Sequence, residues 1–324
     1  MAPPFRVLAI DGGGIRGIIP ATVLVDLERR LAPRPLASVF DLIVGTSTGG
    51  IIALGLTVPD GEQPRHPAQQ LLDLYLSDGE TIFPGGGPIP LPRSAWVREG
   101  TRYSVSGLEE ALFRFLGDTQ LTAALTDVVV TSYDLAYGEP VMLSSRPELG
   151  DVSDVTMVAA ARATSAAPMF FKPQIVKDGN RERMLVDGGV YVNSPALLGY
   201  LLGRQAAARD DVPRVLVSLG TGMRPPRTPL PAAERAQMRD TSALARTLLE
   251  AVATGGGRLA NLLLDRLADG DGLRYWRLQT TVEPCSFTMD DSSPENVACL
   301  YERACELVTE RDEELSAIAD ALAA

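Results

Sequence analysis

Residues 40–56 read FDLIVGTSTGGIIALGL and predict a buried strand, a sharp turn and an apolar helix. The turn, Gly45 to Gly49, fits the G-x-S-x-G pattern of a nucleophile elbow. Its glycines are expected because a Cβ on either side of the serine would strike the neighbouring strand and helix. Ser47 is therefore the candidate nucleophile, at a helix N-terminus whose N–H groups favour the charge formed when an ester carbonyl is attacked. The alternative is a glycine-rich turn whose serine only caps a helix.

A glycine loop follows the first expected strand of the chain. The strand is Phe5–Ile10, the loop reads DGGGIRG at Asp11–Gly17, and a helix is expected from about Ile18 to Leu31. The loop satisfies the dinucleotide fingerprint G-x-G-x-x-G, whose mechanism needs an acidic residue at the end of the next strand. That strand ends in the turn of Ser47, so the pattern disfavours a Rossmann nucleotide site.

The same loop fits an oxyanion hole better. Successive amides of Gly12, Gly13 and Gly14 can point into one spot with no side chain in the way, and Arg16 adds a fixed positive charge nearby. A structural salt bridge between Arg16 and Asp11 is an equally good explanation of the arginine.

The second catalytic candidate is Asp187. The chain has one histidine, His66, in an early loop bracketed by prolines, whereas a hydrolase of the usual α/β order needs its histidine after the acid. Arg183–Val186 is expected as a strand that delivers Asp187-Gly188-Gly189 at its C-terminal end, where catalytic groups gather in open α/β sheets. The alternative is a turn aspartate before flexible glycines.

Composition favours one large soluble α/β domain. The 324 residues are 45% hydrophobic and 22% charged, and the net charge of −11 argues against nucleic acid and against electrostatic docking on anionic lipid. We find no secretory signal and no membrane span, so we expect the mature chain to start here and to be cytoplasmic. Cys285, Cys299 and Cys305 are expected as buried small hydrophobes rather than a disulfide or a metal site.

Strands and helices are expected to alternate as far as Gly222, and helices to dominate afterwards. We divide the domain into a core at residues 1–222 and a mainly helical part at 223–324, with one further strand at Leu273–Thr280 and a terminal acidic helix at Pro294–Ala324. Ile82–Val97 is rich in Gly and Pro and carries apolar side chains. We expect it to be either a mobile flap that meets lipid or a rigid surface loop.

Three motifs in this order resemble the patatin-like phospholipase family: DGGGIRG, GTSTGG and DGG at Asp187–Gly189. RATSAAPMFF and LVDGGVYVNSP also look like family blocks, so the resemblance covers roughly Phe5 to Gly222. It implies a three-layer α/β/α sandwich with a mainly parallel central sheet. It also implies Ser47 as nucleophile, Asp187 as general base, and the amides of Gly12–Gly14 as an oxyanion hole with Arg16 alongside.

The implied reaction is hydrolysis of lipid acyl esters, of the phospholipase A or lysophospholipase type, through an acyl-Ser47 intermediate. It needs no metal and no cofactor. A Ser-Asp dyad agrees with the residues, because a serine hydrolase with a misplaced histidine needs another base. Two alternatives are an acyltransferase, whose elbow usually has a histidine where Thr46 stands, and a non-catalytic storage or nucleotide-binding protein.

The resemblance also suggests partners and control. The expected substrate is membrane phospholipid, met by transient contact at the inner membrane surface. Bacterial family members include phage-defence effectors, which suggests gating by a cyclic di- or trinucleotide, bound between the subunits of a homodimer. The arginines that would bind it are Arg224, Arg227, Arg235, Arg239, Arg246 and Arg258, with Gly255–Gly257 expected to break a helix among them. Ordinary surface arginines are the alternative.

Overall fold

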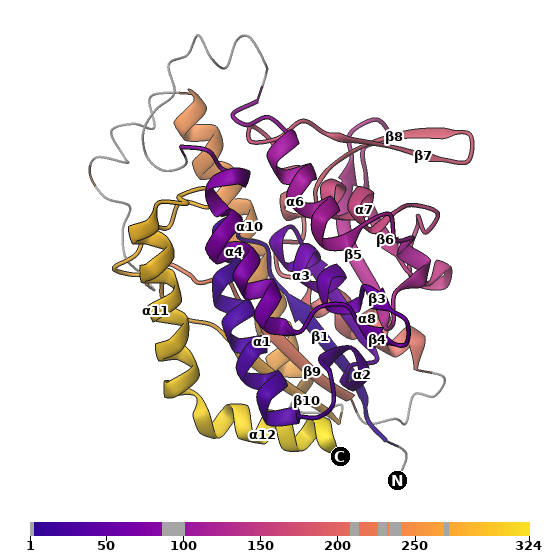
Figure 1. Cartoon of the computed structure of the whole chain (residues 1–324), viewed down its shortest axis with the longest axis vertical. Helices are drawn as coiled ribbons and strands as arrows, with labels where there is room; N and C mark the ends of the chain where they lie inside the picture. The colour runs from indigo at the N-terminus through magenta and orange to yellow at the C-terminus, as the bar shows by residue number, and fades with distance from the viewer. Residues whose placement is uncertain (1–2, 86–100, 208–213, 226–231, 233–240, 269–271) are drawn as a thin grey trace.

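The computed structural model describes residues 3–85, 101–207, 214–225, 232, 241–268 and 272–324 (Figure 1). Within these residues the main sheet has the strand order β10-β9-β1-β2-β5-β8-β7, with β6 paired to β5. Its parallel strands are β1 (Phe5–Ile10), β2 (Leu42–Thr46), β5 (Asp127–Asp134), β9 (Arg214–Leu219) and β10 (Leu273–Leu278). Three antiparallel strands, β6 (Glu139–Ser144), β7 (Gln174–Asp178) and β8 (Arg181–Asp187), complete it, and β3 (Pro59–Asp60) pairs with β4 (Gln63–Pro64) apart from it.

Helices cover both faces of this sheet. The side chains of β1 alternate between two apolar clusters: Leu8 and Ile10 belong to one, Val7 and Ala9 to the other. The first cluster packs under α1 (Ile18–Leu31), α3 (Thr48–Thr57), α4 (Ala68–Ile82), α6 (Ser106–Leu116), α7 (Met157–Thr164), α11 (Pro294–Glu310) and α12 (Asp312–Ala323). The second packs under α8 (Ala196–Ala206) and α10 (Thr241–Ala268). The expected three-layer sandwich with a mainly parallel sheet is confirmed.

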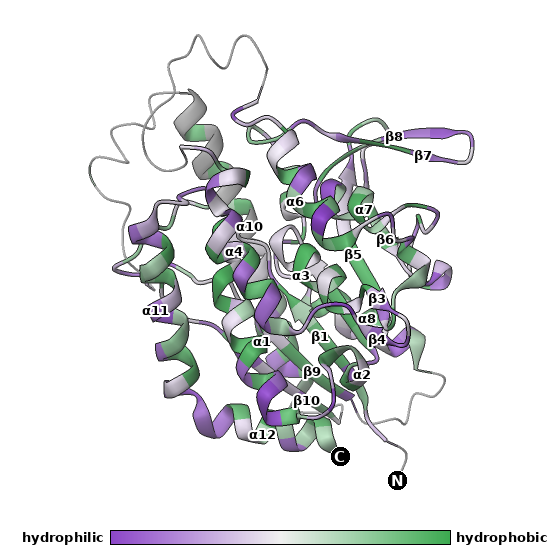
Figure 2. Ribbon diagram, viewed as in Figure 1, coloured by the Kyte–Doolittle hydropathy of each residue, from purple (hydrophilic) through white to green (hydrophobic). Residues whose placement is uncertain are grey.

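The central strands are mostly apolar, drawn largely in green in Figure 2. β2 and β9 are buried at every position. This is the pattern of parallel strands covered on both faces. It explains why strands without polar alternation were recognisable between glycine-rich turns.

The terminal acidic segment forms two helices rather than the single helix expected over Pro294–Ala324. α11 ends at Glu310 and α12 begins at Asp312, and Arg311 between them has backbone angles of φ −109° and ψ 23°. Asp312, Glu313 and Glu314 occupy the first turn of α12. Acidic side chains there favour a new helix N-terminus, because they complement its dipole.

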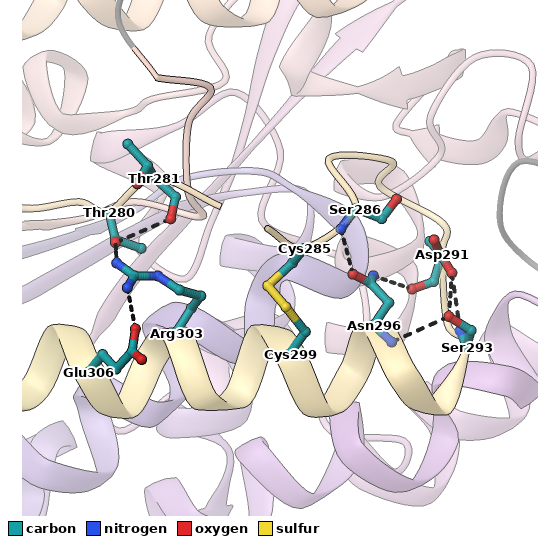
Figure 3. Close-up of a disulfide and its surroundings, with 10 residues drawn as sticks. All are labelled: Thr280, Thr281, Cys285, Ser286, Asp291, Ser293, Asn296, Cys299, Arg303 and Glu306. Atoms are coloured by element: carbon teal, nitrogen blue, oxygen red, sulfur yellow. Dashed lines mark hydrogen bonds and ion pairs between the residues drawn. A yellow bond between two sulfur atoms is a disulfide. The ribbon is translucent and has the colours of Figure 1, made fainter. Parts of the chain in front are cut away.

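The expectation for the cysteines was wrong, because Cys285 and Cys299 form a disulfide (Figure 3). The segment before α11 folds back on the first turns of that helix through Asn296, whose Oδ1 accepts the N–H of Ser286 at 2.9 Å and whose Nδ2 donates to Asp291 O at 2.7 Å. This fold-back sets Cys285 beside Cys299. Cys305 is a free thiol.

The expectation that Gly255–Gly257 break a helix was also wrong, since α10 runs through them from Thr241 to Ala268. A Cβ on Gly257 would lie 3.1 Å from the Cβ of Ser194. The glycine therefore allows α10 to pack closely on the segment that leads into α8.

Most of the proposed flap Ile82–Val97 lies outside the described residues, which resume at Thr101. Of its described part, Ile82 ends α4, and Phe83 packs against the rings of Tyr103 and Phe171 at centroid distances of 5.5 and 5.9 Å. Phe83 is thus partly buried and packs against the core. Across the described ranges, no helix has both the length and the apolarity to cross a bilayer.

Candidate active site

Ser47 sits on a sharp turn between β2 and α3. Its backbone angles, φ 56° and ψ −124°, lie in a region that residues with a Cβ rarely adopt. The turn is held because Ser47 N–H donates to Thr164 Oγ1 at 2.9 Å and its carbonyl accepts from Ile51 N at 3.0 Å. A Cβ on Gly45 would strike the backbone of Gly49, and one on Gly49 would strike that of Ile10. The glycines of the elbow are therefore sterically required, as the sequence predicted.

Asp187 reaches the same edge of the sheet by a route that the sequence did not show. β8 runs antiparallel to β5 and pairs only with its last three residues, so that Asp187 lies opposite Ser132. β2 pairs parallel with β5 on the other side and ends with Thr46 opposite Thr131. The register thus places Asp187 at the level of Ser47, although β8 points against the parallel strands.

The carboxyl group of Asp187 is buried and touches the candidate nucleophile. Burial raises its pKa to about 6, against a lowering by hydrogen bonds from the Ser47 side chain and the Gly189 N–H. The Gly189 N–H lies 2.7 Å from Oδ1. A carboxylate with this pKa is ionised at neutral pH, yet it is a stronger base than an ordinary aspartate.

The glycine loop faces Ser47, since a Cβ on Gly12 would lie 3.2 Å from the Ser47 Cβ. Both backbone polar groups of Gly12 are held: its N–H donates to Asn193 O at 2.9 Å, and its carbonyl accepts from Thr221 Oγ1 at 2.6 Å. In the described part of the chain, no hydrogen bond engages the amides of Gly13 and Gly14. Of the three amides proposed for an oxyanion hole, two are therefore available.

Arg16 is buried and shapes the loop. Its Nε donates to Gly13 O at 3.3 Å, and its guanidinium lies 4.1 Å from the centroid of the Phe287 ring. Gly14, with φ 61°, lies so close to Met289 that a Cβ would strike the Met289 carbonyl. The loop before α11 thus supports the glycine loop from outside.

Sequence reasoning missed Arg277. Its guanidinium binds both carboxylate oxygens of Asp11, one of them at 3.0 Å, and donates to Ser218 Oγ at 2.7 Å. The sequence offers Asp11 as a partner for Arg16, whereas the structure pairs its carboxylate with Arg277. The signal was the strand Leu273–Leu278 itself, LRYWRL, because an arginine inside a strand next to buried β9 needs a carboxylate partner.

A pocket of about 320 Å³ opens beside Ser47 and Asp187. Gly13, Gly14 and Arg16 line it near the dyad. Apolar side chains also line it: Ile51, Ile82, Phe83, Leu108, Phe170 and Phe171. The site therefore combines the Ser47–Asp187 pair with an apolar chamber lined by these side chains, which suits a substrate that carries an ester group and an acyl chain.

His66 takes no part in this pocket. Its Nδ1 lies 2.6 Å from Gln70 Oε1, its Nε2 lies 2.8 Å from Phe115 O, and its ring stacks on that of Phe115 at 3.9 Å. Both ring nitrogens are thereby used in a structural contact. Among the residues that the structure describes, no group of three or more His, Cys, Asp or Glu side chains is arranged to hold a metal.

Comparison with known proteins gives concordant matches. A family model described as patatin-like phospholipase matches residues 8–199, more than half of the 324 residues. Patatin-like protein 2 of Arabidopsis thaliana is 38% identical over 209 residues, covering 59% of this chain and 51% of that protein. Patatin-17 of Solanum cardiophyllum is 36% identical over 244 residues, covering 67% of this chain and 60% of that protein.

The chain thus spans about half the length of the first of these relatives. Among solved structures, human GIVD cytosolic phospholipase A2 matches with a TM-score of 0.48 at 11% identity, covering 98% of this chain and 60% of that chain.

Proposed function

Since the chain belongs to the patatin-like phospholipase family, we propose that it is a lipid acyl hydrolase in which Ser47 is the nucleophile and Asp187 the general base. The observation that carries this proposal is the contact between the Ser47 side chain and a buried carboxylate whose pKa is raised to about 6. A base of that strength accepts a hydroxyl proton more readily than an ordinary aspartate and is still ionised at neutral pH.

The reaction begins when Asp187 takes the hydroxyl proton and Ser47 Oγ attacks the ester carbonyl. The oxyanion accepts hydrogen bonds from the amides of Gly13 and Gly14, because that of Gly12 is bound to Asn193. Asp187 then returns the proton to the leaving alcohol, and an acyl-Ser47 remains. A water molecule, deprotonated by the same carboxylate, attacks the acyl carbonyl; the bond to Ser47 Oγ breaks, Asp187 gives the proton to Oγ, and the fatty acid leaves.

Arg16 acts on the oxyanion through the loop rather than as a direct ligand. It holds the Gly13 carbonyl and stacks on Phe287, which fixes the direction of the adjoining amides. Donors fixed in advance are effective because they need no reorganisation as charge develops.

The apolar chamber supports a long acyl chain and hence a phospholipase A or lysophospholipase activity on membrane phospholipids. The acyltransferase alternative finds less support at Thr46, whose hydroxyl is buried between Thr131 Oγ1 at 2.7 Å and Val192 O at 2.8 Å. A storage or nucleotide-binding role leaves the strained serine and the raised pKa of Asp187 unexplained.

Gating by a cyclic di- or trinucleotide, a homodimer and a role as a bacterial effector stay predictions without support from the comparisons. Of the arginines named for the activator, Arg227, Arg235 and Arg239 lie outside the described residues. Arg224 lies over the Phe287 ring at 4.6 Å, and Arg258 lines the pocket. The expected cytoplasmic location and the expected action at the inner membrane surface likewise stay predictions.

The test is product analysis by mass spectrometry after incubation with phosphatidylcholine and lysophosphatidylcholine. We expect the parent protein to release fatty acid, and Ser47→Ala and Asp187→Asn each to lose about a thousandfold or more in rate, without adding in the double variant. Asp154→Asn, at an exposed loop aspartate, is the matched control. Full activity of Asp187→Asn would remove the dyad from the mechanism.

A further inference from the structure

α10 presents a band of apolar side chains to solvent. Six of its residues, each 40–59% exposed, form this α10 apolar band: Leu244, Leu248, Val252, Leu259, Leu262 and Leu263. Exposed aliphatic side chains are ordinary when scattered singly, but a contiguous group of this size marks a contact surface.

Helix geometry places the six side chains on one face. At 100° per residue they fall within a band about 100° wide, which also contains the exposed Gly255 and, near the C-terminal end of the helix, the exposed Arg266; Gly256 lies just beyond its edge. The opposite side of the helix carries Ala260 and Leu264, which are buried. α10 therefore packs on the sandwich with one apolar face and exposes a second one.

The same helix forms a wall of the active-site pocket. Thr254, Gly257, Arg258 and Asn261 line the pocket from α10 and occupy the helix side between the buried face and the exposed band. The α10 apolar band thus begins next to the rim of the chamber that holds Ser47. A surface seated on the band would meet the mouth of the pocket.

We propose that the α10 apolar band docks on the surface of a phospholipid bilayer, with α10 lying in the interfacial plane and its leucines inserted. The proposal rests on the proposed function and names the surface through which the hydrolase meets its substrate. A helix with a wide apolar face and polar flanks takes this position without spanning the bilayer. Arg258 and Arg266 are exposed on α10 and suit the phosphate groups of lipids.

A second copy of the chain fits the band less well. A stable interface buries about 800 Å² on each partner. A whole aromatic side chain buries only about 150–250 Å², so six half-exposed aliphatic side chains fall short of that area. A bilayer needs no matching protein surface, and it supplies acyl chains directly at the pocket mouth, so a substrate could enter without crossing water.

The experiment measures binding to phosphatidylcholine vesicles, by sedimentation. All proteins carry Ser47→Ala, so that hydrolysis does not alter the vesicles. The test variant is Leu248→Gln with Leu259→Gln and Leu262→Gln, which keeps helix-forming side chains and avoids every pocket-lining residue. The matched control is Phe113→Gln, which removes a side chain that is 60% exposed on α6, in the helical layer on the other face of the sheet.

We expect the triple variant to lose about tenfold or more in vesicle partitioning, since three apolar side chains no longer insert, and Phe113→Gln to bind like the parent. With Ser47 restored, the triple variant should hydrolyse a water-soluble short-chain ester at the parental rate and vesicles more slowly. The proposal is overturned if the triple variant binds vesicles as well as the parent does. It is also overturned if the parent is a dimer in solution and the three substitutions convert it to a monomer. Hydrolysis of the soluble ester by the parent tests the proposed function independently of vesicle binding.

Discussion

Replacing Asp187 by asparagine should stabilise the protein at neutral pH while it removes the proposed base. Burial raises the pKa of Asp187 from 3.8 to about 6, so the folded protein disfavours the charged carboxylate relative to the unfolded chain. Asparagine carries no charge, and its side-chain oxygen can still accept the Gly189 N–H that Oδ1 accepts at 2.7 Å.

The sign and size follow from the two pKa values. A carboxyl group whose pKa is raised on folding stabilises the fold below its unfolded pKa, and this contribution is lost as the pH rises through the folded value. The difference between 3.8 and about 6 corresponds to about 3 kcal/mol at full ionisation. The gain from Asp187→Asn should therefore be about 3 kcal/mol near pH 8 and shrink to about 1 kcal/mol near pH 4.5.

Urea denaturation of both proteins at the two pH values measures this difference in the free energy of unfolding. Asp154→Asn, at an exposed position, should change stability little at either pH. An Asp187→Asn protein that is no more stable than the parent near pH 8 would refute the argument that burial raises the pKa of Asp187 at the expense of stability. The rate of ester hydrolysis by the parent should rise with pH through a midpoint near 6.

Three further outcomes are expected. Arg277→Met should cost about 3–5 kcal/mol in urea denaturation, because it strands the buried carboxylate of Asp11, and adding Asp11→Asn should recover part of the loss; an unchanged midpoint would mean that the pair is dispensable. His66→Ala should keep the parental rate of ester hydrolysis and lose about 1 kcal/mol of stability, because its hydrogen bonds to Gln70 and Phe115 are removed. A folded but inactive His66→Ala protein would instead show that the histidine belongs to a catalytic triad. Cys285→Ser with Cys299→Ser should lower stability by about 3 kcal/mol, since the disulfide spans 14 residues, and added reductant should lower the parent's melting temperature but not the variant's.

The sequence predicted the parts of the site whose cause is local. The turn of Ser47 was recognisable because its glycines are fixed by neighbouring backbone at Gly49 and Ile10. The glycine loop was recognisable from its run of three glycines after a strand, although the atoms that a Cβ would strike there belong to the distant Asn193, Thr221 and Met289. The helix predicted over Ile18–Leu31 begins and ends where expected. Strand, tight turn and helix follow one another within a few residues, so pattern and sterics suffice.

Contacts between segments that lie far apart in the chain could not be predicted from the sequence. Asp11 and Arg277 are 266 residues apart, and only the adjacency of β1, β9 and β10 brings them together. The antiparallel course of β8, which sets Asp187 beside Ser47, depends on a β7–β8 hairpin whose first strand we did not predict.

Two local expectations failed because tertiary packing prevailed. Gly255–Gly257 continue a helix that packs on Ser194, although glycines usually weaken one. Cys285 meets Cys299 only because the chain folds back through Asn296.

The most direct test of the Ser47–Asp187 dyad is to locate the acyl group during turnover. The protein is incubated with a 4-nitrophenyl ester, quenched in acid, digested and examined by tandem mass spectrometry. We predict that the acyl group is on Ser47 in the parent protein and is absent from both Ser47→Ala and Asp187→Asn. An acyl group on another residue, or continued hydrolysis by folded Ser47→Ala, would contradict the mechanism.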